Sequence, residues 1–330
     1  MKKILEKLYQ HYILTEQEAE NFLKEMSKGV FPDVQVAAFL TVFNMRPISV
    51  NELKGFRKAL LDLAIPVDLS DFETIDMCGT GGDGKNTFNI STLASFVVAG
   101  AGYKVAKHGN YGVSSVSGSS NVLEALGYAF TNDEKILQQQ LATANITFLH
   151  APKFHPAMAA VAPARRALKM KTFFNMLGPI VNPSRPNHQL AGVFSLELAR
   201  LYQYLFQEEK GKKYAVIYGL DGYDEISLTG PFMLKNNRGE HLLTPEKLGL
   251  PKIKESDIFG GNTVAEAVEI FKKIIQGKGT VAQNNVVCAN AAMAIQLMKK
   301  EPADFHTCFQ EAKDALLSGK ALKSLQLITS

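Results

Sequence analysis

A stretch of fifteen residues carries the densest set of groups able to bind a ligand. Residues 78–92 read CGTGGDGKNTFNIST and contain four glycines, one aspartate, one lysine, two asparagines and several hydroxyl side chains. Glycines let the backbone adopt left-handed angles and bring its N–H groups close to a ligand. We expect Asn89 to cap the following helix, which would place the N–H groups of Ser91 and Thr92 at its positive end. The stretch therefore indicates a polyphosphate site.

Two common phosphate loops do not fit this stretch. It lacks the terminal lysine and hydroxyl of the G-x-x-x-x-G-K-[ST] loop, and its glycines are too closely spaced for a dinucleotide-binding turn. A glycine-rich turn with a purely structural role remains open from this stretch alone.

A second stretch repeats the chemistry. Residues 107–127 read KHGNYGVSSVSGSSNVLEALG, in which Lys107 ends a predicted strand and glycines and serines form the loop. We expect Asn121 to cap the helix that contains VLEALG. Two loops of one chemical type, each following a strand, can lie side by side at the carboxyl edge of a sheet and share one ligand.

Acidic and basic side chains follow further along the chain. Asp224 and Glu225 stand side by side in DGYDEISLTG, and such carboxylates suit Mg²⁺, which takes few protein ligands and the oxygens of a bound phosphate. An exposed turn is the alternative for an acid pair alone. The segment from residue 150 to 175 supplies two histidines and Arg165, whose planar fork suits a carboxylate.

The elements that must position these groups fall into two kinds. Residues 2–69 have helical periodicity throughout, and Asn51 is the expected cap of the helix NELKGFRKALLDLA. From residue 73, short apolar runs that are candidate strands alternate with helices. The runs are TIDMCG, YKVAKHG, ITFLHAP, LAGVF and YAVIYGL, and long helices end the chain. This order predicts βαβ units.

The sequence thus predicts an α/β protein with a small all-helical domain and a large domain built on a central, mostly parallel sheet. We place the helical domain at residues 1–70 and the α/β domain at 71–330. The run PARRALKMKTFFNMLGPIVNPSRPN interrupts the alternation, so part of residues 163–184 is expected to return to the helical domain.

Composition narrows the class of protein. The formal net charge is +4 over 330 residues without a strong basic run, which is weak support for nucleic-acid binding. No uncharged apolar stretch reaches the ~18 residues of a membrane-spanning helix, and acidic residues interrupt the N-terminus too early for a signal peptide. Cys78, Cys288 and Cys308 lack metal or redox spacing. We expect a cytoplasmic protein without nucleic-acid or membrane partners, and a structural role for Cys78.

Taken together, these segments resemble the anthranilate phosphoribosyltransferases of the nucleoside-phosphorylase-like phosphoribosyltransferase family. The resemblance covers nearly the whole chain and rests on GTGGDG, NIST, KHGN, SGS, VLEALG, HPAM, RRAL, FNMLGPIVNP and GYDEIS, in the order and approximate spacing of the family.

The resemblance implies the site residues. The substrate 5-phosphoribosyl 1-pyrophosphate would contact Gly79, Gly82, Asp83, Thr87, Asn89, Ile90, Ser91, Thr92, Lys107, His108, Gly109, Asn110, Tyr111, Gly112, Val113, Ser114, Ser115 and Ser119. Anthranilate would contact Gly79, Asn110, Arg165, His108 and His155. Mg²⁺ would be the cofactor, held at Ser91, Asp224 and Glu225, and Lys107, Asn110 and Arg165 would be the catalytic residues.

The implied reaction transfers a phosphoribosyl group to the amine of anthranilate and releases pyrophosphate, in tryptophan biosynthesis, and the family habit implies a homodimer through the helical domain. Two rivals on the same scaffold are a pyrimidine nucleoside phosphorylase, whose loop would read closer to K-x-S-x-G-G-V-G-D, and a nucleic-acid-binding relative, which would need no acid pair. Many family members have arginine where this chain has Tyr111 and Ala159, so two positive charges are missing near the expected site.

Overall fold

The computed structural model describes residues 1–112 and 116–329. A seven-stranded sheet has the strand order β3-β2-β1-β4-β5-β6-β7. Its parallel strands are β1 (Thr74–Gly79), β2 (Lys104–Gly109), β3 (Ile146–His150), β4 (His188–Gly192) and β5 (Lys213–Gly219). The hairpin of β6 (Phe232–Asn236) and β7 (Gly239–Leu243) completes the sheet in antiparallel orientation. The predicted mostly parallel sheet is confirmed, whereas sequence periodicity did not indicate the hairpin.

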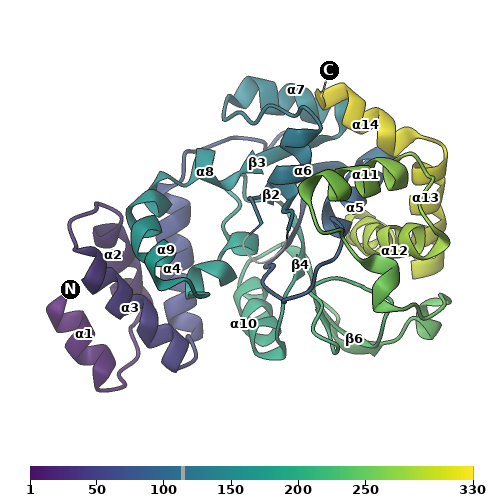
Figure 1. Ribbon diagram of the computed structural model, residues 1–330. Coiled ribbons are helices and arrows are strands. Elements are labelled where there is room, and N and C mark those ends of the chain that lie inside the picture. The colour runs from purple at the N-terminus through teal and green to yellow at the C-terminus, as the bar shows by residue number, and fades with distance from the viewer. Residues whose placement is uncertain (113–115, 330) are drawn as a thin grey trace.

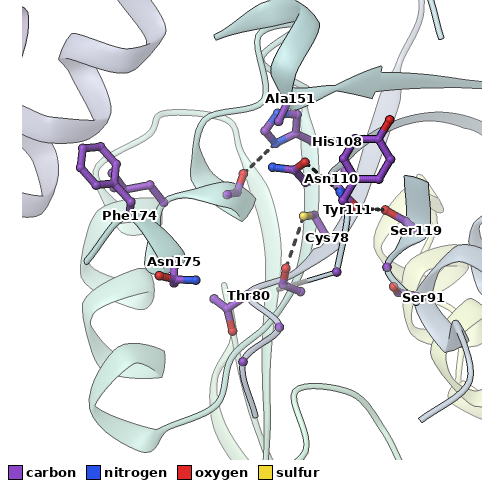
Figure 2. Close-up of a pocket in the computed structure, with 18 of the residues that line it drawn as sticks. Cys78, Thr80, Ser91, His108, Asn110, Tyr111, Ser119, Ala151, Phe174 and Asn175 are labelled. Carbon is purple, nitrogen blue, oxygen red and sulfur yellow. Dashed lines mark hydrogen bonds between the residues drawn. The ribbon is translucent and has the colours of Figure 1, made fainter. Parts of the chain in front are cut away.

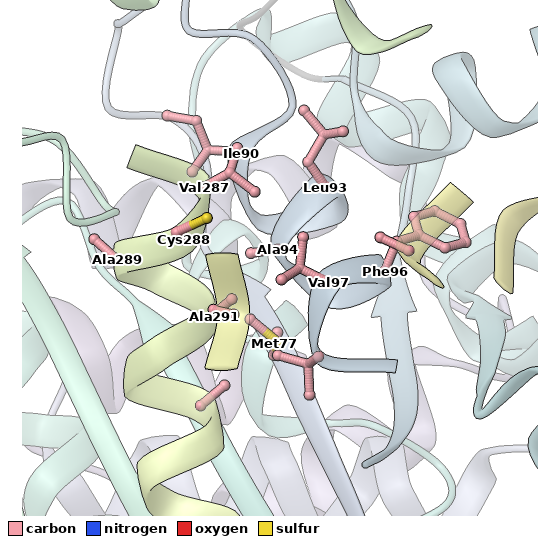
Figure 3. Packing of buried hydrophobic residues seen from close by; sticks show 14 of the residues in the cluster. Met77, Ile90, Leu93, Ala94, Phe96, Val97, Val287, Cys288, Ala289 and Ala291 are labelled. Atoms are coloured by element: carbon pink, nitrogen blue, oxygen red, sulfur yellow. The ribbon is translucent and has the colours of Figure 1, made fainter. Parts of the chain in front are cut away.

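Helices cover the sheet on both sides (Figure 1). The larger apolar core joins the sheet to α5 (Ile90–Gly100), α11 (Val264–Ile275), α12 (Val281–Met298), α13 (Phe305–Leu317) and α14 (Lys320–Thr329). Figure 3 shows the apolar side chains of α5 packed against those of α12, with Met77 of β1 below them in the view. The helix α7 (Glu134–Ala144) packs against β2 and β3, α6 (Ser119–Ala125) against α11, and α10 (Leu196–Gln207) against β5. The middle of β1 is therefore buried in this core, which fixes the position of the loop that follows the strand.

The N-terminal region is helical, as predicted. The helices α1 (Lys2–Tyr9), α2 (Glu16–Met26), α3 (Asp33–Met45) and α4 (Val50–Leu63) gather at one end of the molecule, with α9 (Ala162–Leu168) beside them (Figure 1). Their apolar core continues into the packing of α10 on β4 and β5.

A ring cluster ties the segment after α9 to this helical region. The ring of Phe173 stacks on that of Phe56 with centroids 4.5 Å apart and meets the edges of Phe43 and Phe39 at 5.0 and 6.0 Å. Aromatic pairs of this kind add to the apolar burial. The segment therefore connects the N-terminal helices with the sheet, while the domain boundary at residue 70 stays a prediction.

Short helical turns complete the chain. They are α8 (Ala151–Phe154) and the 3₁₀ turns Pro156–Val161, Phe173–Met176, Gly178–Ile180, Glu246–Leu248 and Glu255–Ile258. Among the described residues, no helix is long and apolar enough to cross a membrane.

One predicted helix cap was wrong in this region. The cap of α4 is Ser49 rather than Asn51, because the Ser49 hydroxyl accepts from the N–H of Glu52 while the Glu52 carboxylate accepts from the N–H of Ser49. This reciprocal pair satisfies two backbone donors, which a cap at Asn51 would not do. The strand predicted as LAGVF also lies earlier, at His188–Gly192.

Candidate active site

A cavity of about 610 Å³ opens at the carboxyl ends of β1 and β2. The chain leaves β1 toward β2 and β3 and returns on the other side of β1 as β4, so the cavity lies at the point where the strand order reverses. Such a reversal leaves a crevice at the strand ends, where open α/β sheets bind ligands. The helical region contributes Leu60 of α4 and Arg165 of α9 to its walls. In Figure 2, Phe174 and Asn175 lie across the cavity from Ser91 and Ser119.

The cavity brings together most of the predicted site residues. Those lining it are Gly79, Gly82, Asp83, Thr87, Asn89, Ser91, Thr92, Lys107, His108, Gly109, Asn110, Tyr111, Gly112, Ser119, His155, Arg165, Asp224 and Glu225. Ile90 is fully buried in the apolar core and does not line the cavity. Val113, Ser114 and Ser115 lie outside the described residues.

The glycine-rich loop donates a backbone hydrogen bond to a carboxylate in this structure. Gly81, Gly82 and Gly84 have φ values of 59°, 73° and 75°, which other residues rarely adopt. This conformation directs the N–H of Gly81 at Oδ2 of Asp224, 2.7 Å away. The loop thus presents backbone donors toward the acid pair, which is the geometry that an anionic ligand needs.

The start of α5 differs from the expectation. Asn89 occupies the cap position, but its side chain donates to the carbonyl of Ser117 at 3.0 Å and does not cap the helix. The N–H of Ser91 instead donates to Oε1 of Glu225 at 2.9 Å. A carboxylate from a distant loop therefore occupies the positive end of this helix, and the predicted capping role of Asn89 was wrong.

Three carboxyl groups lie close together beside the loop. Burial, with the Asp83 charge as the second cause, raises the pKa of Asp224 to about 7. Burial and then the charge of Asp224 raise the pKa of Glu225 well above its usual range, and burial raises that of Asp83. Acids held in this way need protons or a cation.

The donor set fits a magnesium ion that is completed by substrate. In the described part of the chain, no group of three or more His, Cys, Asp and Glu side chains is arranged to hold a metal by itself. Mg²⁺ characteristically takes one or two carboxylates, keeps several waters and uses phosphate oxygens. The raised pKa values of the two adjacent acids, Asp224 and Glu225, match that requirement.

Lys107 reaches the cavity from the end of β2. Its side chain is only 2% exposed, and Nζ donates to the carbonyl of Met77 on the neighbouring strand. The buried carboxylate of Asp76 accepts from the N–H of His108 at 3.0 Å, directly after the lysine. The lysine therefore has a fixed position at the floor of the cavity.

Two neutral histidines form part of the wall. Burial lowers the pKa of His108 to about 4 and that of His155 to about 3, and their rings meet edge to face at 5.3 Å. Nδ1 of His108 donates to the carbonyl of Gly178 at 2.8 Å, which fixes the ring. At neutral pH both rings present uncharged surfaces suited to an aromatic molecule.

Arg165 provides a cation opposite the loops. Its guanidinium carbon lies 5.3 Å from the centroid of the Phe174 ring, and burial lowers its pKa. No ion pair involves Arg165 within residues 1–112 and 116–329. Its charge is therefore available to an anionic ligand in the cavity.

The second loop is held by its neighbours at both ends. Oδ1 of Asn121 accepts from the N–H groups of Gly112 and Gly118, each at 3.0 Å. The helix α6 already begins at Ser119, so Asn121 lies in its first turn and the predicted capping position was wrong. The ring of Tyr111 meets that of His150 edge to face at 5.0 Å.

Comparison with known proteins decides the family. A model of the helical bundle domain of a glycosyl transferase family matches residues 2–64, and the model of its a/b domain matches residues 71–322. An anthranilate phosphoribosyltransferase from Flavobacterium psychrophilum is 58% identical over 327 residues, which cover 99% of this chain and 98% of that protein. This chain belongs to the anthranilate phosphoribosyltransferase family.

Solved structures of the family have the same fold. The anthranilate phosphoribosyltransferase of Thermus thermophilus matches 98% of both chains with a TM-score of 0.89 at 31% identity. The Saccharomyces cerevisiae enzyme, solved in complex with PRPP and Mg, also gives 0.89, at 26% identity over 98% of this chain and 95% of that one.

Three further residues that the sequence singled out also line the cavity. Tyr111 and Ala159, which stand where many members have arginine, both line the cavity, so the missing charges concern the site itself. Cys78 lies at the cavity floor, where burial raises the pKa of its thiol to about 12. A thiol of this kind is a poor nucleophile, in agreement with a structural role.

Sequence reasoning missed several residues that shape the site in this family member. Lys171 donates from its ammonium group to the carbonyl of Gly82 and so joins the segment after α9 to the glycine-rich loop. Asn175 lines the cavity, and Asn290 of α12 bonds to the backbone next to Glu225. No motif marks Asn290, because it lies between apolar residues in the middle of a helix far along the chain.

Proposed function

We propose that this chain transfers the phosphoribosyl group of 5-phosphoribosyl 1-pyrophosphate to anthranilate, giving N-(5-phosphoribosyl)anthranilate and pyrophosphate in tryptophan biosynthesis, with Mg²⁺ as cofactor. One observation carries the proposal. A single cavity joins a loop of backbone donors, a pair of acids that needs a cation, and a buried guanidinium on the opposite wall. These are the three recognition elements that a pyrophosphate, a metal ion and an aromatic carboxylate require.

The pyrophosphate moiety is assigned to the two loops. The residues that would contact 5-phosphoribosyl 1-pyrophosphate are Gly79, Gly82, Asp83, Thr87, Asn89 to Thr92, Lys107 to Ser115 and Ser119, of which Val113, Ser114 and Ser115 lie outside the described residues. The positive φ values of the glycines and the position of Lys107 at the cavity floor support the assignment. Ile90 can take part only through its backbone, because its side chain belongs to the core.

Ser91, Asp224 and Glu225 would hold the magnesium ion. When bound, the ion neutralises the charge that develops on the departing pyrophosphate. The two acids supply oxygen ligands from one side of the cavity, and their repulsion in the folded protein favours cation binding.

Anthranilate is assigned to the wall formed by the helical region. Arg165 would meet the carboxylate, and Gly79 and Asn110 would lie along the amine. The neutral rings of His108 and His155 would line the approach of the aromatic ring. The Saccharomyces cerevisiae relative has also been solved in complex with 4-fluoroanthranilate, which supports an aromatic acceptor.

The residues then act by positioning and charge. Lys107 would stabilise the departing pyrophosphate, while Asn110 and Arg165 hold the amine in line with the ribose carbon. No covalent nucleophile is needed for this transfer, in keeping with the high pKa of Cys78. Movement of residues 1–70, together with part of 163–184, toward residues 71–330 would exclude water that could hydrolyse the activated sugar.

We also propose a cytoplasmic homodimer that associates through the helical domain. Tyr9, Tyr12 and Ile13 are each more than half exposed at the end of α1, and such apolar surface favours association. Light scattering at working concentration would detect the dimer, and a monomer would contradict it.

The reaction is tested by anthranilate fluorescence. Purified protein, 5-phosphoribosyl 1-pyrophosphate and magnesium should remove the anthranilate signal, and omission of magnesium should preserve it. Replacing Asp224 and Glu225 with alanine should abolish the magnesium-dependent change. Turnover that is unaffected by the double substitution would refute the metal assignment, and no turnover by folded wild-type protein would refute the proposed reaction.

A further inference from the structure

One polar side chain of α12 is buried among apolar residues behind the acid pair. The buried positions of α12 are otherwise aliphatic residues, methionines and a cysteine, but Asn290 is among them and only 3% exposed. A buried amide is costly unless its donors and acceptor are paired. Asn290 therefore needs a specific reason for its position.

The hydrogen bonds of Asn290 supply that reason. Its Oδ1 accepts from the N–H of Ile226 at 3.1 Å, and its Nδ2 donates to the carbonyl of the same residue at 2.9 Å. A third bond runs from Nδ2 to the carbonyl of Val286 at 2.9 Å, within α12 itself. The side-chain amide thus forms hydrogen bonds with both the N–H and the carbonyl of Ile226, the residue that follows Glu225.

The acid segment is also confined by the backbone of two strand ends. A Cβ atom on Gly192 would lie 1.5 Å from the carbonyl oxygen of Asp224, and one on Gly79 would lie 2.5 Å from its Oδ2. The segment therefore contacts two strand ends as well as Asn290. A small void of about 20 Å³ is lined by Asn290 together with Asp224 and Glu225.

We propose that Asn290 is a positioning residue, which acts through the backbone of Ile226 to hold Asp224 and Glu225 where they can share one cation. This inference rests on the proposed function. Two like-charged acids repel each other, and without this double hydrogen bond their segment could move away from the glycine-rich loop. The Ser91 N–H contact to Glu225 and the Gly81 N–H contact to Asp224 depend on the same placement.

The test compares Asn290→Leu and Asn290→Ala with a matched control, Gln296→Leu. Gln296 lies on the same helix and donates to the carbonyl of Ala303 at 2.8 Å, away from the acids. If Asn290→Leu does not fold, Asn290→Ala takes its place in the comparison. Thermal unfolding reports the structural effect of each substitution separately.

Two readouts address the metal directly. The first is binding of Mn²⁺ alone, followed by electron paramagnetic resonance, and the second is the Mg²⁺ concentration that gives half-maximal turnover. We expect both constants to rise about 10- to 100-fold in the Asn290 variants and to stay unchanged in Gln296→Leu, the usual consequence of losing a residue that supports metal ligands. The KM for anthranilate should change little.

The outcomes separate the inference from the proposed function. The inference alone would be overturned if wild-type protein turns over with magnesium and the folded Asn290 variants bind Mn²⁺ and respond to Mg²⁺ as the wild type does. Equal metal effects in the Gln296 control would also overturn it, because a general loss of stability would then suffice. Wild-type protein without magnesium-dependent turnover would instead refute the proposed function.

Discussion

Replacing Asp224 with asparagine should stabilise the metal-free protein while it abolishes activity. The folded protein holds this carboxyl beside Asp83 in a buried position, where its pKa rises to about 7. An asparagine has nearly the same shape and carries no charge, and its carbonyl oxygen can still accept from the N–H of Gly81. The substitution therefore removes the electrostatic cost and preserves the contact.

The magnitude follows from the pKa. At about 1.4 kcal/mol per pKa unit, a rise from 3.8 to about 7 destabilises the folded protein by about 4 kcal/mol above pH 7. The folded state binds the proton more tightly than the unfolded state, so its stability falls as the pH rises from about 4 to 7 and is constant above that. For a chain of 330 residues, removal of the whole cost would raise the melting temperature by roughly 5 °C.

Thermal unfolding of wild type and Asp224→Asn at pH 8 and pH 5, with and without magnesium, is the assay. The advantage of the variant in folding free energy should be largest at pH 8 without metal and should shrink by about 3 kcal/mol as the pH falls from 8 to 5. Magnesium should stabilise wild type more than the variant. A melting temperature of the variant at or below that of wild type at pH 8 without metal would refute the reasoning.

Three further substitutions test the walls of the cavity. Arg165→Lys should raise the KM for anthranilate about ten-fold or more, because an ammonium group lacks the planar fork that pairs with a carboxylate; an effect confined to the pyrophosphate substrate would contradict this role. Lys171→Met should raise the KM for 5-phosphoribosyl 1-pyrophosphate about five-fold, since the Gly82 carbonyl loses its partner, whereas the exposed Lys153→Met should not. Gly192→Ala should lower turnover about 100-fold, because its Cβ would displace the Asp224 carbonyl; near-normal turnover would show that this segment has room to move.

The order of strands and helices and their arrangement in layers could be predicted, because the spacing of apolar residues differs between strands and helices. Apolar strands such as 104–109 and 213–219 and helices such as 134–144 had clear patterns that the structure confirms. The β6–β7 hairpin could not be found in this way, since β7 is largely exposed and its residues GEHLL show no apolar alternation. Periodicity reports burial, and an edge strand has little of it.

The site could be predicted as a set of loops but not as a set of contacts. Glycines and serines mark loops in the sequence, whereas the partner of each hydrogen bond depends on which distant segment packs there. Asn89 illustrates the limit. Its type and place before a helix predicted a cap, but the carboxylate of Glu225, 134 residues away in the chain, takes the Ser91 N–H.

The bond between the Ser91 N–H and Glu225 has a consequence for the binding of pyrophosphate. Glu225 occupies the N–H at the start of α5, which on the proposed function is one of the donors for pyrophosphate. The carboxylate and the pyrophosphate are both anions, so they compete for this position unless a cation lies between them. Magnesium bound by Asp224 and Glu225 would turn the repulsion into a shared set of ligands. On the proposed function, a requirement for magnesium would follow from where the fold places the acids, at the same helix terminus that would receive the phosphate.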